Sequence, residues 1–149
     1  MSSASWMKAP WMNITTVVGL SAAMGLASGC DSKINQCNRL IEVINNEQAP
    51  IKEMDKQDND PESFKKLADV LDGVAGTVRG VEVKEEELQK FRDDYATMAS
   101  ELATSSREAA EALGGTDMKK TTEAIKKMQS FESRESELVG NINKYCSGS

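Results

Sequence analysis

The chain has 149 residues, enough for one domain, and it carries 24 acidic and 18 basic side chains, a net charge of −6, and no histidine. The acidic balance argues against nucleic acid as a partner. The lack of histidine removes the commonest metal ligand and the usual general base, so we expect no metal site, no cofactor and no enzymatic activity.

The first 29 residues have the composition of a targeting segment. Lys8 is the only charged residue before Asp31, residues 14–26 are mainly apolar, and residues 27–29 are small. A secretory signal combines a basic start, a short apolar stretch and small residues at the cleavage site. An uncleaved membrane anchor is the alternative, because a spanning helix needs about 20 mainly apolar residues. Either interpretation predicts that the rest of the chain lies outside the cytoplasm.

Cys30 follows the run Leu26-Ala27-Ser28-Gly29. This pattern resembles the lipobox of bacterial lipoproteins, although the commonest lipobox has leucine where Ala27 stands. The resemblance implies cleavage before Cys30 and attachment of acyl chains, palmitate among them, to its sulfur and new amino end. It also implies a lipid anchor in a bacterial membrane, with the protein facing the periplasm or the exterior of the cell envelope.

Cleavage would divide the chain into a signal peptide, residues 1–29, and a lipid-anchored domain, residues 30–149. The domain would have 120 residues, with all 24 acidic side chains and 17 of the 18 basic ones, because Lys8 is lost. That length is sufficient for one hydrophobic core.

Within the domain, four segments show the spacing of apolar side chains that is typical of amphipathic helices, and none indicates a β-strand of any length. The first segment runs from about residue 32 to residue 57. Pro50 predicts a kink or a break near residues 48–50, because proline lacks a backbone donor and clashes with the preceding turn. The apolar stripe of this segment consists of Ile34, Cys37, Leu40, Ile41, Ile44, Ile51 and Met54.

The second helix is predicted to start at Pro61, with Asp60 as its N-cap, and to pass into an extended link at residues 81–83. Its stripe consists of Phe64, Leu67, Leu71, Val74, Val78 and Val81. Gly73, Gly76 and Gly80 weaken its second half by about 1 kcal/mol each relative to alanine. We interpret these glycines as places where a neighbouring helix approaches closely.

The third helix is predicted to begin with Glu85, Glu86 and Glu87, where negative charge suits the helix dipole, and to end at Gly114–Gly115. Its stripe consists of Leu88, Phe91, Tyr95, Met98, Leu102, Ser105, Ala109 and Ala112. The fourth helix carries Met118, Ile125, Met128, Ile142 and Tyr145, with Phe131 and Leu138 beside this stripe and Glu132 and Glu135 interrupting it.

Four such segments joined by short links predict an all-α fold, an antiparallel up-down-up-down four-helix bundle with a Pro-kinked first helix. In that topology Cys37 and Cys146 lie at the same end. Two cysteines in an oxidising compartment predict a disulfide, and closing a loop of about 100 residues stabilises a fold by about 4.7 kcal/mol in the loop-entropy model. Two separate thiols are the alternative.

These features favour a non-catalytic lipoprotein that acts as a structural or protein-interaction module of the cell envelope. Its expected partners are the membrane, through the acyl chains on Cys30, and a protein of unknown identity. The alternative is a helical carrier or sensor of a small ligand, which an apolar cavity near residues 73–80 would favour. Pairing with another chain as a coiled coil also remains open.

Overall fold

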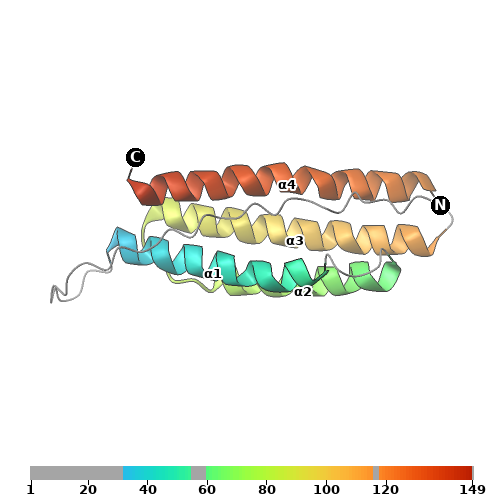
Figure 1. Cartoon of the computed structure of the whole chain (residues 1–149), viewed down its shortest axis with the longest axis horizontal. Helices are drawn as coiled ribbons and strands as arrows, with labels where there is room; N and C mark the ends of the chain where they lie inside the picture. Colours follow the sequence, from blue (N-terminus) through green and yellow to red (C-terminus); the bar gives the residue numbers. More distant parts are fainter. Residues whose placement is uncertain (1–31, 55–59, 116–117, 149) are drawn as a thin grey trace.

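The computed structural model describes residues 32–54, 60–115 and 118–148, and every regular element in these ranges is an α-helix. The helices are α1 (Lys33–Met54), α2 (Pro61–Arg79), α3 (Glu86–Gly114) and α4 (Met118–Ser147). They lie side by side along one long axis (Figure 1). The predicted all-α helical bundle is therefore confirmed.

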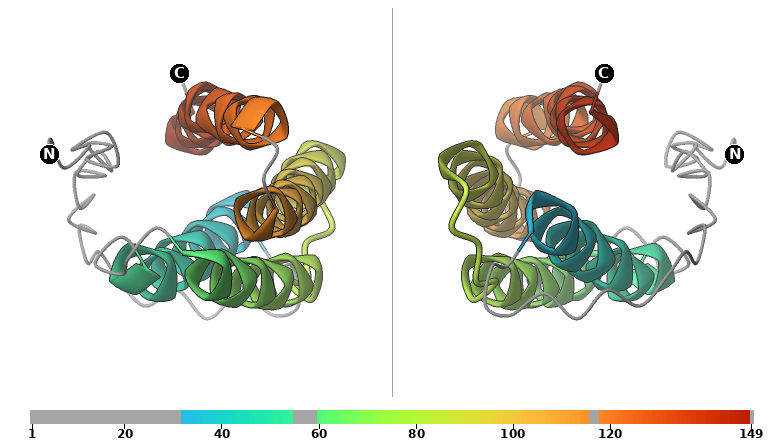
Figure 2. Two further views of the ribbon diagram at one scale, coloured as in Figure 1. Left: turned by 90° about the vertical axis from the view of Figure 1, so that its right-hand side faces the viewer. Right: turned by 90° about the vertical axis from the view of Figure 1, so that its left-hand side faces the viewer.

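The helices pack mainly in chain order. α3 packs against both α2 and α4, whereas α1 lies mainly against α2 and touches α3 and α4 in few places. The end views show α1 and α2 next to each other below, with α3 above α2 and α4 at the top (Figure 2). α1 and α4 are thus the two outer members of a curved layer, and α3 is its centre.

α1 continues through Pro50 to Met54, so the proline does not break the helix. Pro50 is exposed, while its neighbour Ile51 is only 6% exposed and belongs to the core. The proline removes one backbone donor on the solvent side, where water can satisfy the carbonyl that loses its partner. Burial of the apolar side chains around it keeps the helix continuous.

The predicted boundaries of α2 are confirmed. The Asp60 side chain accepts a hydrogen bond of 2.8 Å from the backbone N–H of Ser63, and Pro61 occupies the first turn. This bond lowers the pKa of the Asp60 carboxyl. The helix ends at Arg79, and residues 81–84 link it to α3 without regular secondary structure.

α3 buries two stripes of side chains because it has a helix on each side. The first is the predicted stripe from Leu88 to Ala112. The second contains only small residues spaced three and four apart, and it was not predicted: Ala96, Ala99, Ala103, Ser106 and Ala110.

The stripe of small residues, 96–110, faces α2. Arg107 of α3 forms ion pairs with Asp69 and Asp72 of α2, and Ser100 bonds Arg79 at the other end of α2. Ala103 lies one turn from both Arg107 and Ser100, and it is fully buried. Small side chains on this face let the backbones of α2 and α3 approach closely. The contacts of Ser100 and Arg107 follow each other in opposite order along α2, where Arg79 comes after Asp69 and Asp72.

The opposite rim of α3 faces α4. Glu101 pairs with Arg134 at 2.8 Å, and Glu108 pairs with Lys127 at 3.1 Å. These pairs are half-exposed, so each adds roughly 0.2–1 kcal/mol and chiefly fixes the register of α4 on α3.

The interpretation of the α2 glycines is wrong. Gly73 and Gly76 are exposed, and a Cβ atom added at either position would meet nothing within 4 Å. The close approach between α2 and α3 comes from the alanines of α3. The two glycines lie on the solvent-facing side of α2.

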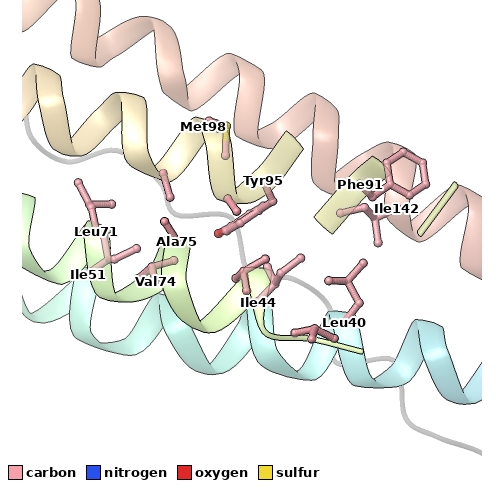
Figure 3. Packing of buried hydrophobic residues seen from close by; sticks show 14 of the residues in the cluster. Leu40, Ile44, Ile51, Leu71, Val74, Ala75, Phe91, Tyr95, Met98 and Ile142 are labelled. Carbon is pink, nitrogen blue, oxygen red and sulfur yellow. The ribbon is translucent and has the colours of Figure 1, made fainter. Parts of the chain in front are cut away.

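The main core gathers side chains from all four helices (Figure 3). Leu40 and Ile44 of α1 belong to this core, together with Tyr95 of α3 and Ile142 of α4. A smaller cluster consists of Phe64, Ala109, Ala110 and Ala124, and it has no member from α1.

Three predictions about the apolar stripes are wrong. Ile34 is 67% exposed and Met118 is 76% exposed, although both continue the stripes in the sequence. Each occupies the first turn of its helix. Phe131, predicted to lie beside the α4 stripe, is 4% exposed and lies within the main core.

A pair of substitutions tests the packing of α2 on α3. Ala103→Leu should lower the free energy of unfolding by about 1–3 kcal/mol, because the added atoms have no space between the two backbones. Gly76→Ala should raise it by about 0.4–1 kcal/mol, because the new methyl group meets nothing and the unfolded chain loses freedom. Urea unfolding measures both. An Ala103→Leu variant as stable as the parent would contradict the close approach.

Candidate functional site

Cys37 and Cys146 form a disulfide, as predicted, with an S–S distance of 2.15 Å and Cα atoms 5.7 Å apart. Cys37 lies in the second turn of α1 and is 2% exposed, whereas Cys146 lies in the last turn of α4 and is half-buried. The bond therefore joins the two outer helices of the layer. The third cysteine of interest, Cys30, lies outside the described residues.

Beside the disulfide, α1 holds the link between α2 and α3. The Gln36 side-chain oxygen accepts hydrogen bonds from the backbone N–H groups of Glu85, at 3.0 Å, and of Lys84. Arg39 donates to the carbonyl oxygen of Glu82 at 3.0 Å.

Gln36 supports the N-terminal end of α3 from another helix. The N-cap of α3, Glu85, makes no capping hydrogen bond with its own side chain, so donors at the start of this helix need a partner from elsewhere. Gln36 is 1% exposed and supplies that partner from α1. Sequence analysis missed this role. The one available signal was negative: no Ser, Thr, Asp or Asn stands immediately before Glu85–Glu87.

Aromatic contacts add to the same end of the bundle. Tyr145, next to Cys146, meets the ring of Phe91 edge-on with centroids 5.8 Å apart. The ammonium group of Lys33 lies 3.7 Å from the centre of the Tyr145 ring. Side chains from the first turn of α1 and the last turns of α4 thus reinforce the junction that the disulfide makes.

A second polar feature lies between α3 and α4. The Tyr95 hydroxyl, in a side chain that is 2% exposed, donates a hydrogen bond of 3.1 Å to Glu135. Burial is the main cause that raises the pKa of Glu135, and repulsion from Glu132 adds to it. The Tyr95 bond and the charge of Lys52 on α1 act in the opposite direction. Burial and the carboxylates of Glu135 and Glu47 also raise the pKa of Tyr95.

Glu135 was predicted only as a residue that interrupts the apolar stripe of α4. The structure gives it a partner and turns it toward the core. Because its charged form is disfavoured there, the carboxyl group retains its proton to a higher pH than a solvated glutamate.

An open hollow lies between α1, the end of α2, the link and the start of α3, next to Gly76 and Gly80. Its wall carries cationic side chains from all four segments, together with two carboxylates. These charged residues are Arg39, Arg79, Lys84 and Arg92, with Glu42 and Glu82. An apolar cavity near residues 73–80 would favour a carrier or sensor of a small ligand, whereas the hollow found there is open and combines apolar with charged side chains.

Within the described residues, no group of three or more potential ligands could hold a metal ion. No helix in the same part of the chain is long and apolar enough to cross a membrane. No protein-family model, no curated protein and no solved structure matches the chain.

The Glu135 environment predicts a pH-dependent difference in stability. A raised carboxyl pKa means that the folded state binds more protons than the unfolded state between the ordinary glutamate pKa, about 4.3, and the raised value. Stability from this group is thus fully present at low pH and is lost as pH rises through that window. Glu135→Gln should therefore become more stable relative to the parent as pH rises from 4 to 8, because the parent must ionise a buried carboxyl group and the amide does not.

Urea unfolding at a series of pH values measures this difference. Glu137→Gln, on the exposed side of α4, is the matched control and should show no such trend. A Glu135→Gln curve that runs parallel to the parent at every pH would contradict the raised pKa.

Proposed function

We propose that the protein is a bacterial lipoprotein whose residues 1–29 are a cleaved signal peptide and whose Cys30 carries the acyl chains. The proposal is supported by the lipobox-like run before Cys30 and by the start of α1 at Lys33, three residues further on. A rigid domain that begins so soon after the lipidated residue would be held close to the membrane surface.

The observation that carries this proposal is the Cys37–Cys146 disulfide. Disulfides persist in oxidising compartments, outside the cytoplasm. The cysteines then divide into one for lipid and two for the bond. This division agrees with export and leaves no thiol unassigned.

We further propose an up-down-up-down topology in which the disulfide end lies nearest the lipid. α3 and α4 have 29 and 30 residues, so at 1.5 Å per residue the bundle would project about 45 Å from the membrane. The exposed surface would carry the ion pairs and lysines of the outer helix faces.

In this position the domain would act as a non-catalytic structural or protein-interaction module of the cell envelope. The absence of histidine and the use of most buried polar groups within the fold support a binding role over catalysis. The alternative, a helical carrier or sensor of a small ligand, is less well supported, because the hollow beside α2 is open to solvent and is not a cavity enclosed between helices.

Substitution of Cys30 tests the anchor. In a bacterial host that makes lipoproteins, the parent protein should incorporate an alkyne-labelled fatty acid, and Cys30→Ala should abolish the label because the acceptor sulfur is gone. The double substitution Cys37→Ala and Cys146→Ala is the matched control, and it should keep the label while losing the disulfide. In-gel fluorescence measures both. Equal labelling of Cys30→Ala and the parent, or no labelling of the parent, would contradict the proposal.

A further inference from the structure

Ile34 is an exposed apolar side chain close to the proposed lipid anchor. Among the large hydrophobic side chains that the structure describes, only Ile34, at 67%, and Met118, at 76%, are exposed. A single exposed apolar side chain is ordinary on a protein surface. The position of Ile34 is what distinguishes it, because it lies in the first turn of α1, four positions after Cys30.

The chain leaves little distance between Cys30 and α1. The Ser32 hydroxyl accepts a hydrogen bond of 3.3 Å from the backbone N–H of Asn35, and the Ser32 carbonyl accepts one of 3.1 Å from that of Gln36. These bonds fix the start of the helix at Ser32, so only Asp31 separates it from Cys30. Two residues span at most about 7 Å. Acyl chains on Cys30 would therefore hold the first turn of α1 against the lipid headgroups.

The first turns of α1 are fastened to the rest of the bundle on both sides of Ile34. The ammonium group of Lys33 lies 3.7 Å from the centre of the Tyr145 ring, Gln36 accepts hydrogen bonds from the link, and the disulfide holds Cys37. These contacts leave Ile34 in the solvent and keep it from turning into the core. The anchor and the Ile34 side chain are thus held in a fixed relation to the whole domain.

The charges at this end do not favour anionic lipid. The link and the first turn of α3 meet the first turns of α1, and they carry one lysine among four acidic side chains: Lys84, with Glu82, Glu85, Glu86 and Glu87. Membrane binding through charge needs a cluster of basic side chains. A membrane contact at this end therefore depends on apolar insertion, which does not require a particular headgroup charge.

We infer that the first turn of α1 is a membrane-contact surface in which the Ile34 side chain inserts into the lipid bilayer. The inference rests on the lipid anchor proposed above, and it adds a specific contact between the folded domain and the lipid. Met118 is the natural reference position. It begins α4, the helix that carries Cys146 in its last turn, so it lies about 40 Å from the disulfide along that helix.

Tryptophan fluorescence tests the inference, because the lipidated chain would contain no tryptophan of its own: Trp6 and Trp11 precede Cys30. Lipidated Ile34→Trp and Met118→Trp are each transferred from detergent into phosphatidylcholine vesicles, with and without bromine on the acyl chains. Brominated lipid should reduce the emission of Ile34→Trp at least about twofold, because bromine quenches an indole that reaches the headgroup–acyl boundary. Met118→Trp should keep its intensity.

Circular dichroism checks that each variant is folded, and Asn35→Trp, exposed in the same turn, replaces Ile34→Trp if the latter unfolds. Vesicles with anionic lipid should give the same quenching. Three results would overturn the inference: no quenching of Ile34→Trp, equal quenching of both variants, or quenching only in anionic vesicles. An emission shift to shorter wavelength without quenching would also overturn it, and would indicate that a protein covers the site.

Fatty-acid labelling of the same samples separates this inference from the anchor on which it rests. A labelled Ile34→Trp protein that is not quenched contradicts the membrane contact alone. A protein that carries no label contradicts the anchor itself.

Discussion

The Cys37–Cys146 bond is the constraint on which the arrangement of the helices depends. The helices pack in chain order, so α1 and α4 would be two open edges of a curved layer, and they touch each other in few places. The disulfide joins these edges at one end. It also fixes the first turns of α1, and these turns hold the α2–α3 link through Gln36 and Arg39. One covalent bond thus organises the ends of all four helices.

α3 is the helix on which the non-covalent packing of the bundle depends most. It buries large side chains toward the common core and small ones toward α2, with ion pairs along both rims. Burial on two sides explains how α3 can contain so many alanines and still be the centre of the fold. α4 packs mainly on α3, through buried side chains such as Phe131 and Ile142 and through ion pairs, and the disulfide adds its link to α1.

Most of the fold could be predicted from local patterns. Periodic apolar residues marked all four helices, Asp60 with Pro61 marked the start of α2, and the two cysteines marked the closing bond. The stripe of small residues on α3 was missed because alanine and serine give little hydrophobic signal, even at regular spacing. Ile34 and Met118 were misplaced because periodicity does not show where the neighbouring helix ends.

The candidate sites were harder to predict, for a related reason. Gln36 accepts a hydrogen bond from Glu85, the N-cap of α3, which lies 49 positions later in the chain, and no sequence spacing encodes that contact. The arginines around the hollow come from three helices and meet only after folding. Cys30 is the opposite case. Its proposed role depends on a short run of neighbouring residues, and such a run can be recognised in the sequence without knowledge of the fold. The proposed lipid anchor would act at the same end of α1 as the disulfide.

Hydrogen exchange before and after reduction of the disulfide tests the central claim most directly. If the bond holds α1 against the link, reduction should lower the protection of the Lys84 and Glu85 amides at least about tenfold, or about 1.4 kcal/mol, while Ala103 in the centre of α3 keeps most of its protection. Unchanged protection at Lys84 and Glu85 in the reduced, folded protein would contradict the claim that this bond organises the end of the bundle.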